Sequence, residues 1–145
     1  MQGASPYQLI YVSTSRFPWV TPDLKTLFEE NHTRNAVQGI TGILIYHDRQ
    51  FLQVIEGGDV PVRRLFGKIE RDPRHFNVSR VWDGYLHSRE YSDYTLAFDD
   101  GSEPSRHPHP TLNPFELSRW PPNHRETRSP ADEFLRIFRR ISKRR

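Results

Sequence analysis

The segment GITGILIYHDRQFLQVIEGG, residues 39–58, constrains the fold more than any other part of the chain. Two apolar runs flank the turn HDRQ at 47–50, which predicts a β-hairpin with strands at 39–46 and 50–56. The second run carries the amide of Gln53 at its centre, although an apolar residue would suit a buried strand. This polar side chain in the clearest strand of the chain needs an explanation.

The rest of the first hundred residues predicts a regular alternation of elements. Further strands are expected at 7–13, 78–86 and 94–98, where apolar and β-branched residues gather between turn signals. A helix is predicted to start at the cap Thr21, with Pro22 at its first position, and to run to about residue 34.

A second helix starts at Asp59 and stops at Asp72-Pro73, with an apolar stripe along one side. The order β-α-β-β-α-β-β predicts an α+β fold of ferredoxin-like type, a mixed sheet with both helices on one face. A helical extension is predicted to follow this fold at the C-terminus.

The composition divides the chain into a domain, 1–100, and an extension, 101–145. Seven of the 12 prolines fall in the extension, so 101–128 is expected to be irregular. Ser129 then starts a predicted helix over 130–143. Its apolar stripe is Phe134, Ile137, Phe138 and Ile141, opposite basic residues, and we expect it to pack against the open face of the sheet rather than to anchor in a membrane. A basic amphipathic helix could also contact an acidic partner.

Charge and residue usage exclude several classes of function. The pI near 9.4 suggests nucleic-acid binding, but residues 1–100 hold 11 Lys and Arg against 13 Asp and Glu, a net charge of −2. The net charge of +5 in 101–145 comes from 10 basic and 5 acidic residues, so nucleic acid is not the expected partner of the folded part.

The absence of cysteine excludes disulfides and thiol nucleophiles. Without a membrane span or a signal peptide, a cytoplasmic location is expected.

Catalytic motifs are scarce. The sequence has no glycine-rich phosphate loop and no zinc spacing, and His107-Pro108-His109 is more typical of a solvated loop than of a metal site. An RNA-binding sheet would display aromatics on its central strands, where this chain offers Leu, Gln and Val. A small hydrolase of acylphosphatase type would need an Arg–Asn pair at a phosphate loop, and Arg34-Asn35 lies at a helix end instead.

Three polar residues stand out: Tyr11 on the first strand, Asn35 at the end of the first helix, and Gln53. If the first and third strands are neighbours, the phenol and the Gln53 amide can meet beside the helices. Pattern alone also allows a structural interpretation, in which Tyr11 is a core residue, Asn35 a helix C-cap and Gln53 an edge residue.

Four segments together resemble the blue-light-sensing flavin domain known as BLUF. They are YQLIYVS, RNAVQGITGILIY, FLQVIEG and LFGKIERDPRH, in the family's order, and the resemblance runs from about Tyr7 to Phe98. In that family a Tyr, an Asn and a Gln in the corresponding motifs surround the flavin ring, and the resemblance places them at Tyr11, Asn35 and Gln53.

The resemblance implies a photoreceptor rather than an enzyme. Blue light would excite a non-covalently bound flavin, Tyr11 would give an electron and then a proton through Gln53, and the hydrogen bonds around Gln53 would rearrange. FAD is the expected flavin, and FMN and riboflavin share the same ring. Leu27 and Ile69 would cover the two faces of the ring. Residues matched to positions near the ring edge, ribityl chain or phosphates are Arg34, Lys68, Asp72, Arg74 and His75.

The last strand departs from the family pattern. A Trp and a Met two residues apart are usual there, and this chain has Tyr94 and Leu96. Leu96 has no sulfur to accept a hydrogen bond, so transmission of a signal through it would depend on packing. We expect the light signal to pass to an unidentified downstream protein. We also expect the chain to form a homo-oligomer. The alternative is a cofactor-free ferredoxin-like module that binds nucleic acid or protein through its basic tail.

Overall fold

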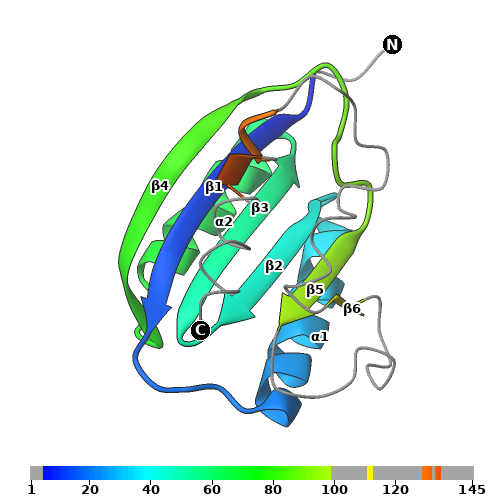
Figure 1. The fold of residues 1–145 in the computed structure, drawn as a ribbon. Helices are drawn as coiled ribbons and strands as arrows, with labels where there is room; N and C mark the ends of the chain where they lie inside the picture. Colours follow the sequence, from blue (N-terminus) through cyan, green and yellow to red (C-terminus); the bar gives the residue numbers. More distant parts are fainter. Residues whose placement is uncertain (1–4, 99–110, 113–128, 132, 135–145) are drawn as a thin grey trace.

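The computed structural model describes residues 5–98, 111–112, 129–131 and 133–134. Its elements in chain order are β1 (Tyr7–Ser15), α1 (Thr21–Val37), β2 (Thr41–His47), β3 (Gln50–Gly57), α2 (Asp59–Glu70), β4 (His75–Tyr85), β5 (Tyr94–Phe98) and β6 (Thr111–Leu112) (Figure 1). The predicted β-α-β-β-α-β-β order is confirmed.

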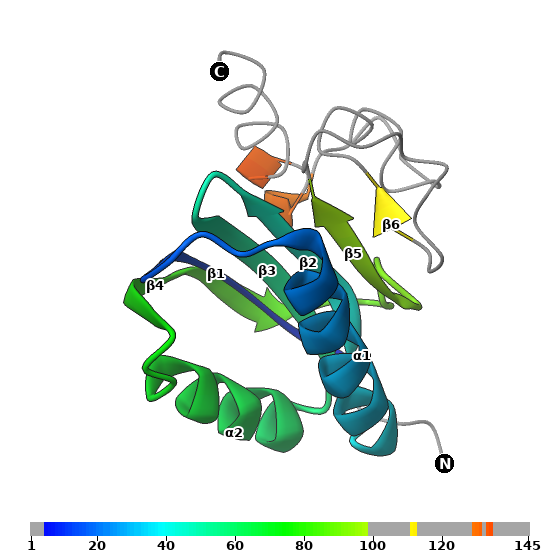
Figure 2. The ribbon, with the colours of Figure 1, turned by 90° about the horizontal axis from the view of Figure 1, so that it is seen from below.

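One mixed sheet holds all the strands that the structure describes, in the order β4-β1-β3-β2-β5-β6. β1 is antiparallel to both β3 and β4, β2 is antiparallel to β3, and β2 is parallel to β5. Both helices cover the same face of this sheet (Figure 2). The fold is therefore the predicted ferredoxin-like α+β arrangement, with β1 and β3 as neighbours inside the sheet.

The β2–β3 hairpin closes with a two-residue turn. Asp48 and Arg49 adopt left-handed conformations, with φ of 48° and 69°. Two successive residues with positive φ give a turn whose twist matches that of the flanking strands. The Arg49 guanidinium donates to the backbone oxygens of Ser15 and Arg16 at 2.8–3.1 Å, which ties the turn to the end of β1.

The predicted ends of α1 were wrong. Its N-cap is Val20 rather than Thr21, and the helix continues to Val37, past the predicted end near residue 34. Gln38 is the C-cap, and its N–H donates to backbone oxygens of the last turn. Asn35 is therefore an internal helix residue and not a C-cap.

Two strand boundaries also differ from prediction. β2 begins at Thr41 instead of residue 39, because Gly39 has a φ of 70° and belongs to the turn that follows α1. β4 covers His75–Tyr85 rather than 78–86. A φ of 54° at Asn77 and register shifts against β1 disrupt the strict alternation in this part of β4. β6 lies in the stretch that was expected to be irregular.

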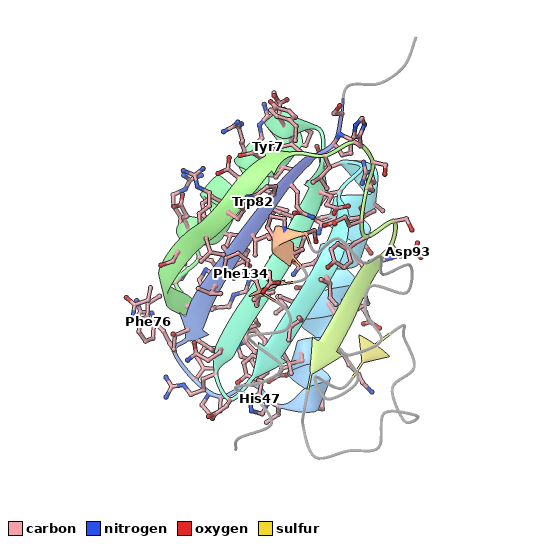
Figure 3. All side chains as sticks on the ribbon, turned by 45° about the horizontal axis from the view of Figure 1, so that its top comes forward. Tyr7, His47, Phe76, Trp82, Asp93 and Phe134 are labelled. Carbon is pink, nitrogen blue, oxygen red and sulfur yellow. The ribbon has the colours of Figure 1, made fainter. Side chains whose placement is uncertain are left out.

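The open face of the sheet carries its own apolar cluster. The buried members are Ile10, Ile43, Ile45, Leu52, Val54, Tyr91 and Ala131. Phe134 and Trp82 pack against it, and both are labelled in Figure 3. The start of the C-terminal segment thus lies on the face opposite the helices (Figure 2). The rest of the predicted helix over 130–143 lies outside the described residues.

Candidate functional site

A cavity of about 510 Å³ lies between α1, α2 and the sheet. Its lining includes every residue that the sequence predicts to switch or bind a cofactor, namely Tyr11, Leu27, Arg34, Asn35, Gln53, Lys68, Ile69, Asp72, Arg74 and His75. The volume lies within the range of about 300–1,000 Å³ typical of small-molecule sites. Residues from four separate sequence segments therefore meet around one space.

Tyr11 and Gln53 meet at the sheet side of the cavity. They are register partners on β1 and β3, and the Tyr11 hydroxyl donates to Gln53 Oε1 at 2.5 Å. Both residues are buried, with exposed fractions of 4% and 3%. The structural interpretation of Gln53 as an edge residue is therefore wrong, because β3 lies inside the sheet. Asn35, 3% exposed, brings a second amide to the cavity wall from α1.

Apolar side chains from both helices line the cavity. Leu27 of α1 and Ile69 of α2 both line the cavity, and their covering of the two faces of a flat ligand stays a prediction. The sequence reasoning did not assign Ile40, Leu44 and Leu65, which add apolar surface to the same lining. Such walls with a polar end suit a planar, mostly apolar molecule that has hydrogen-bonding groups along one edge.

Trp19 is a lining residue that sequence reasoning missed. It follows β1 in a connection without periodicity, so no pattern marks it. Its backbone N–H donates to the Tyr46 hydroxyl at 2.9 Å, and its ring makes an edge contact with Phe51. The indole Nε1 is buried and has no hydrogen-bond partner among the described residues. A buried donor without a partner is costly, so it favours a ligand that brings an acceptor to this wall.

Positively charged residues gather where the two helices meet the cavity. Arg34 of α1 and Lys68 of α2 line it, and Arg64 of α2 joins them, while the predicted contacts of Arg34 and Lys68 with a cofactor stay predictions. The four-residue spacing of Arg64 and Lys68 places both on one side of the helix, a signal that could have identified Arg64. Arg34 donates to Asn31 Oδ1, which orients its guanidinium along α1. The resulting positive potential favours an anionic group such as a phosphate.

Asp72 and Arg74 form a local pair at the end of α2. The Arg74 guanidinium donates to both carboxylate oxygens at 2.6–3.1 Å, and its backbone N–H donates to Asp72 Oδ1 at 2.9 Å. The hydrogen bonds from Arg74 hold the pKa of Asp72 below its ordinary value. Arg74 also lies over the Trp19 ring, 5.8 Å from its centroid. Asp72 thus caps the turn, as the sequence allowed, and positions Arg74 at the cavity.

His75 connects three elements beside the cavity. Its Nε2 lies 2.6 Å from the Ile69 carbonyl oxygen, which can only accept, so Nε2 carries the proton. Its Nδ1 lies 2.8 Å from Ser13 Oγ and accepts from that hydroxyl when the imidazole is neutral. The ring makes edge contacts with Tyr11 and Phe51. Both ring nitrogens are used by the protein, so His75 presents its ring rather than a nitrogen to a ligand.

Tyr94 and Leu96 are placed only by strand register. In the parallel β2–β5 pair, Leu96 lies opposite Leu44, and Leu44 lies opposite Gln53 on β3. Leu96 is therefore two strands away from Gln53 along one row of the sheet. The side chains of Tyr94 and Leu96 lie outside the described part of the structure.

Comparison with known proteins identifies the family. The model of the BLUF family, sensors of blue light using FAD, matches residues 7–97. The chain belongs to the BLUF family. The photoactivated adenylate cyclase subunit beta of Euglena gracilis is 37% identical over 89 residues, which are 61% of this chain and 10% of that protein. BLUF proteins are blue-light sensors that use a flavin, and this chain carries such a sensor domain.

Solved BLUF structures share the fold. BlrB, a BLUF protein in its dark state, has a TM-score of 0.65 at 25% identity, covering 94% of this chain and 97% of that one. Klebsiella pneumoniae BlrP1 with FMN and cyclic diGMP has a TM-score of 0.58 at 34% identity, covering 66% of this chain and 26% of that one. The BLUF match corresponds to only about a tenth of the cyclase, so the remaining activity of that protein is not transferred to this chain.

Two further properties concern only the part of the chain that the structure describes. None of its helices has the length and apolar character needed to cross a membrane. The search of these same residues finds no group of three or more His, Cys, Asp or Glu side chains arranged to hold a metal ion. His107 and His109 lie outside them.

Proposed function

We propose that this BLUF domain senses blue light through a flavin held in the cavity, with Tyr11 as electron and proton donor and Gln53 as the switching amide. The observation that carries the proposal is the buried Tyr11–Gln53 hydrogen bond at the cavity wall. When bound, a flavin absorbs blue light and becomes a strong electron acceptor in its excited state.

Tyr11 is suited to the donor role by its surroundings. Its ring is enclosed by Phe66, at a centroid distance of 5.7 Å, and by the edge of His75 at 6.4 Å. Loss of an electron makes a phenol strongly acidic, and its proton has an acceptor already in place at Gln53 Oε1. Proton transfer along an existing hydrogen bond requires no search for a partner.

Gln53 provides two discrete hydrogen-bond arrangements. In the described arrangement Oε1 accepts from Tyr11. Rotation of the amide by 180°, or its tautomerisation, would exchange the donor and acceptor ends, and the phenol oxygen can accept as well as donate. The strand backbone need not move for either change. Light would therefore alter which groups the amide offers to the ligand, without net chemistry.

The lining residues support a flavin. Leu27 and Ile69 would cover the ring faces, while Asn35 and Gln53 would bond its polar edge. Arg34, Lys68, Asp72, Arg74 and His75 would bind or position the remaining polar groups. The cationic residues favour FAD or FMN over riboflavin, because only the first two carry phosphate. FAD is our expectation, in line with the family's description.

Output would pass from Gln53 across the sheet toward Tyr94 and Leu96 on β5, and from there to a downstream protein. BLUF domains signal to effector domains or partners. We propose that this chain acts without catalysis of its own, as a cytoplasmic homo-oligomer. Leu96 would transmit the change by packing contacts, because it has no sulfur acceptor.

The decisive experiment is the visible spectrum of purified protein in darkness and directly after blue light. A flavin spectrum that moves slightly to the red and relaxes in darkness is expected, and Tyr11→Phe should abolish the shift while flavin binding persists. Tyr7→Phe is the matched control. It removes another buried phenol of β1, one that donates to Asp83 and does not line the cavity, so the shift should remain.

Other outcomes of the same experiment are equally informative. A bound flavin whose spectrum does not move would contradict the switching roles of Tyr11 and Gln53. A colourless protein that takes up no added flavin would contradict the cofactor proposal and favour the alternative, a binding module that acts through its basic tail.

A further inference from the structure

A tryptophan from the connection between β1 and α1, residues 16–20, forms part of the cavity wall. Trp19 is half-buried and packs against the apolar cluster that contains Leu27 and Phe51. Its backbone N–H donates to the Tyr46 hydroxyl at 2.9 Å. The rings of Trp19 and Phe51 meet edge to face, with centroids 6.3 Å apart and an interplanar angle of 77°. These contacts place the indole at the cavity although its segment has no regular secondary structure.

The indole N–H has no acceptor within the described part of the chain. Its Nε1 is buried and makes no hydrogen bond there. The cluster around Trp19 is apolar except for the Tyr46 hydroxyl, which already accepts from the Trp19 backbone. An indole nitrogen only donates, so no rearrangement of its proton can satisfy it. A buried donor left in this way is costly, and it favours a ligand that supplies an acceptor.

Arg74 adds a second group of donors beside the indole. Its guanidinium lies over the Trp19 ring, 5.8 Å from the centroid. Hydrogen bonds to the Asp72 carboxylate at 2.6–3.1 Å use Nε and Nη2, and none of its hydrogen bonds to described residues uses Nη1. An indole N–H and a guanidinium offer donors only. The ligand group that suits this part of the wall is therefore an acceptor such as a carbonyl oxygen.

The indole lies near the place proposed for the polar edge of the flavin ring. Phe51 and Gln53 are two residues apart on β3, so their side chains lie on the same face, and both line the cavity. Trp19 contacts Phe51 and is thus one position along the sheet from Gln53. A flavin ring carries two carbonyl oxygens on its polar edge. The amides of Asn35 and Gln53 can bind one of them, which leaves the other for the indole.

We infer that Trp19 is a flavin-binding residue whose indole N–H donates to a carbonyl oxygen of the flavin ring. This inference rests on the proposed function, because it requires a flavin in this cavity. Trp19 is only half-buried, so its ring can adjust when a ligand fills the space beside it. The bond would satisfy the buried donor and add to the affinity, while the Tyr11–Gln53 hydrogen bond would stay as it is.

NMR of the ¹⁵N-labelled indole groups tests the bond directly. The full chain has three tryptophans, and the Trp19 signal is identified by its loss when Trp19 is replaced. Riboflavin, which has no phosphate, is added to protein freed of flavin. We expect the Trp19 indole proton to move downfield and its solvent exchange to slow about tenfold or more. The Trp82 indole packs on the open face and should not change.

Two replacements of Trp19 separate the N–H from the packing of the ring. Trp19→Phe keeps an aromatic ring beside Phe51 and should raise the riboflavin Kd about tenfold. Benzothienylalanine at the same position has sulfur in place of the N–H and nearly the shape of tryptophan, so it should cause a similar loss. Trp82→Phe is the matched control on the opposite face and should leave the Kd unchanged. Benzothienylalanine decides the question even if Trp19→Phe does not fold.

The outcomes distinguish this inference from the proposed function. If riboflavin binds while the Trp19 signal stays unchanged, or if benzothienylalanine leaves the Kd unaltered, Trp19 is not a binding residue and the proposed function stands. A slowly exchanging Trp19 indole already present without flavin would identify an ordered water as the acceptor and overturn the inference. A response to FMN but not to riboflavin would assign the acceptor to the phosphate, against a ring carbonyl. Protein that takes up no flavin would overturn both proposals.

Discussion

Glu56 should make the folded domain less stable as the pH rises through the weakly acidic range. Its pKa is raised from 4.5 to about 7, mainly by burial, so the folded state binds the proton more tightly than the unfolded state. Stability falls with pH wherever the unfolded state binds fewer protons. One pKa unit corresponds to about 1.36 kcal/mol, so the Glu56 contribution to the free energy of unfolding should decrease by about 3 kcal/mol between pH 4.5 and 7.5.

The perturbation that isolates this effect is Glu56→Gln, which removes the titration and keeps the shape. Urea unfolding of both proteins at half-unit pH intervals from 4.5 to 8 gives the difference in unfolding free energy. Histidines and other carboxylates contribute to both proteins and cancel in this difference. We expect the wild type to lose about 3 kcal/mol relative to Glu56→Gln across the range. A difference that stays flat, or that changes in favour of the wild type with rising pH, would refute the reasoning.

Further predictions concern the hairpin, the cavity wall and β5. Gly42→Ala should cost about 3 kcal/mol or more in thermal or urea unfolding, because the new Cβ would lie 1.8 Å from the backbone oxygen of Val54. Tyr46→Phe should cost about 1–3 kcal/mol, since it leaves the Trp19 backbone N–H without its acceptor, and an unchanged unfolding midpoint would contradict this. Leu96→Met should alter the light-minus-dark infrared difference spectrum of β5. An equal difference spectrum in the wild type and in Leu96→Met would contradict a distinct role for Leu96.

The sequence was most informative where one periodicity dominated. Alternation on either side of residues 47–50 located the β2–β3 hairpin, and the helix stripes placed both helices on one face. Once β1 and β3 are neighbours, the contact between Tyr11 and Gln53 follows from register alone. The resemblance to BLUF supplied the other cavity residues, and the structure gathers them around one space, while their roles in binding stay predictions.

Features that depend on contacts between distant segments were not predictable in this way. Asn77, with its positive φ, disrupts alternation in β4, so the first residues of that strand gave no signal. Trp19 reaches the cavity from a connection without any periodic pattern. The Glu56 partners Glu90 and Tyr91 are backbone groups more than thirty residues away, and a backbone N–H has no sequence signature.

The buried amide of Gln53 on β3 is one of two polar features of the β1–β3 ladder. The β1–β3 ladder carries two polar pairs, Tyr11–Gln53 toward the cavity and Gln8–Glu56 toward the open face. Each pair includes an amide, which has a donor end and an acceptor end of nearly equal size. Its rotation therefore reverses the hydrogen bonding without changing packing volume or strand register. The β1–β3 ladder therefore holds one such amide on each of its faces, and rotation of either amide would leave intact the strand pairing that specifies the fold.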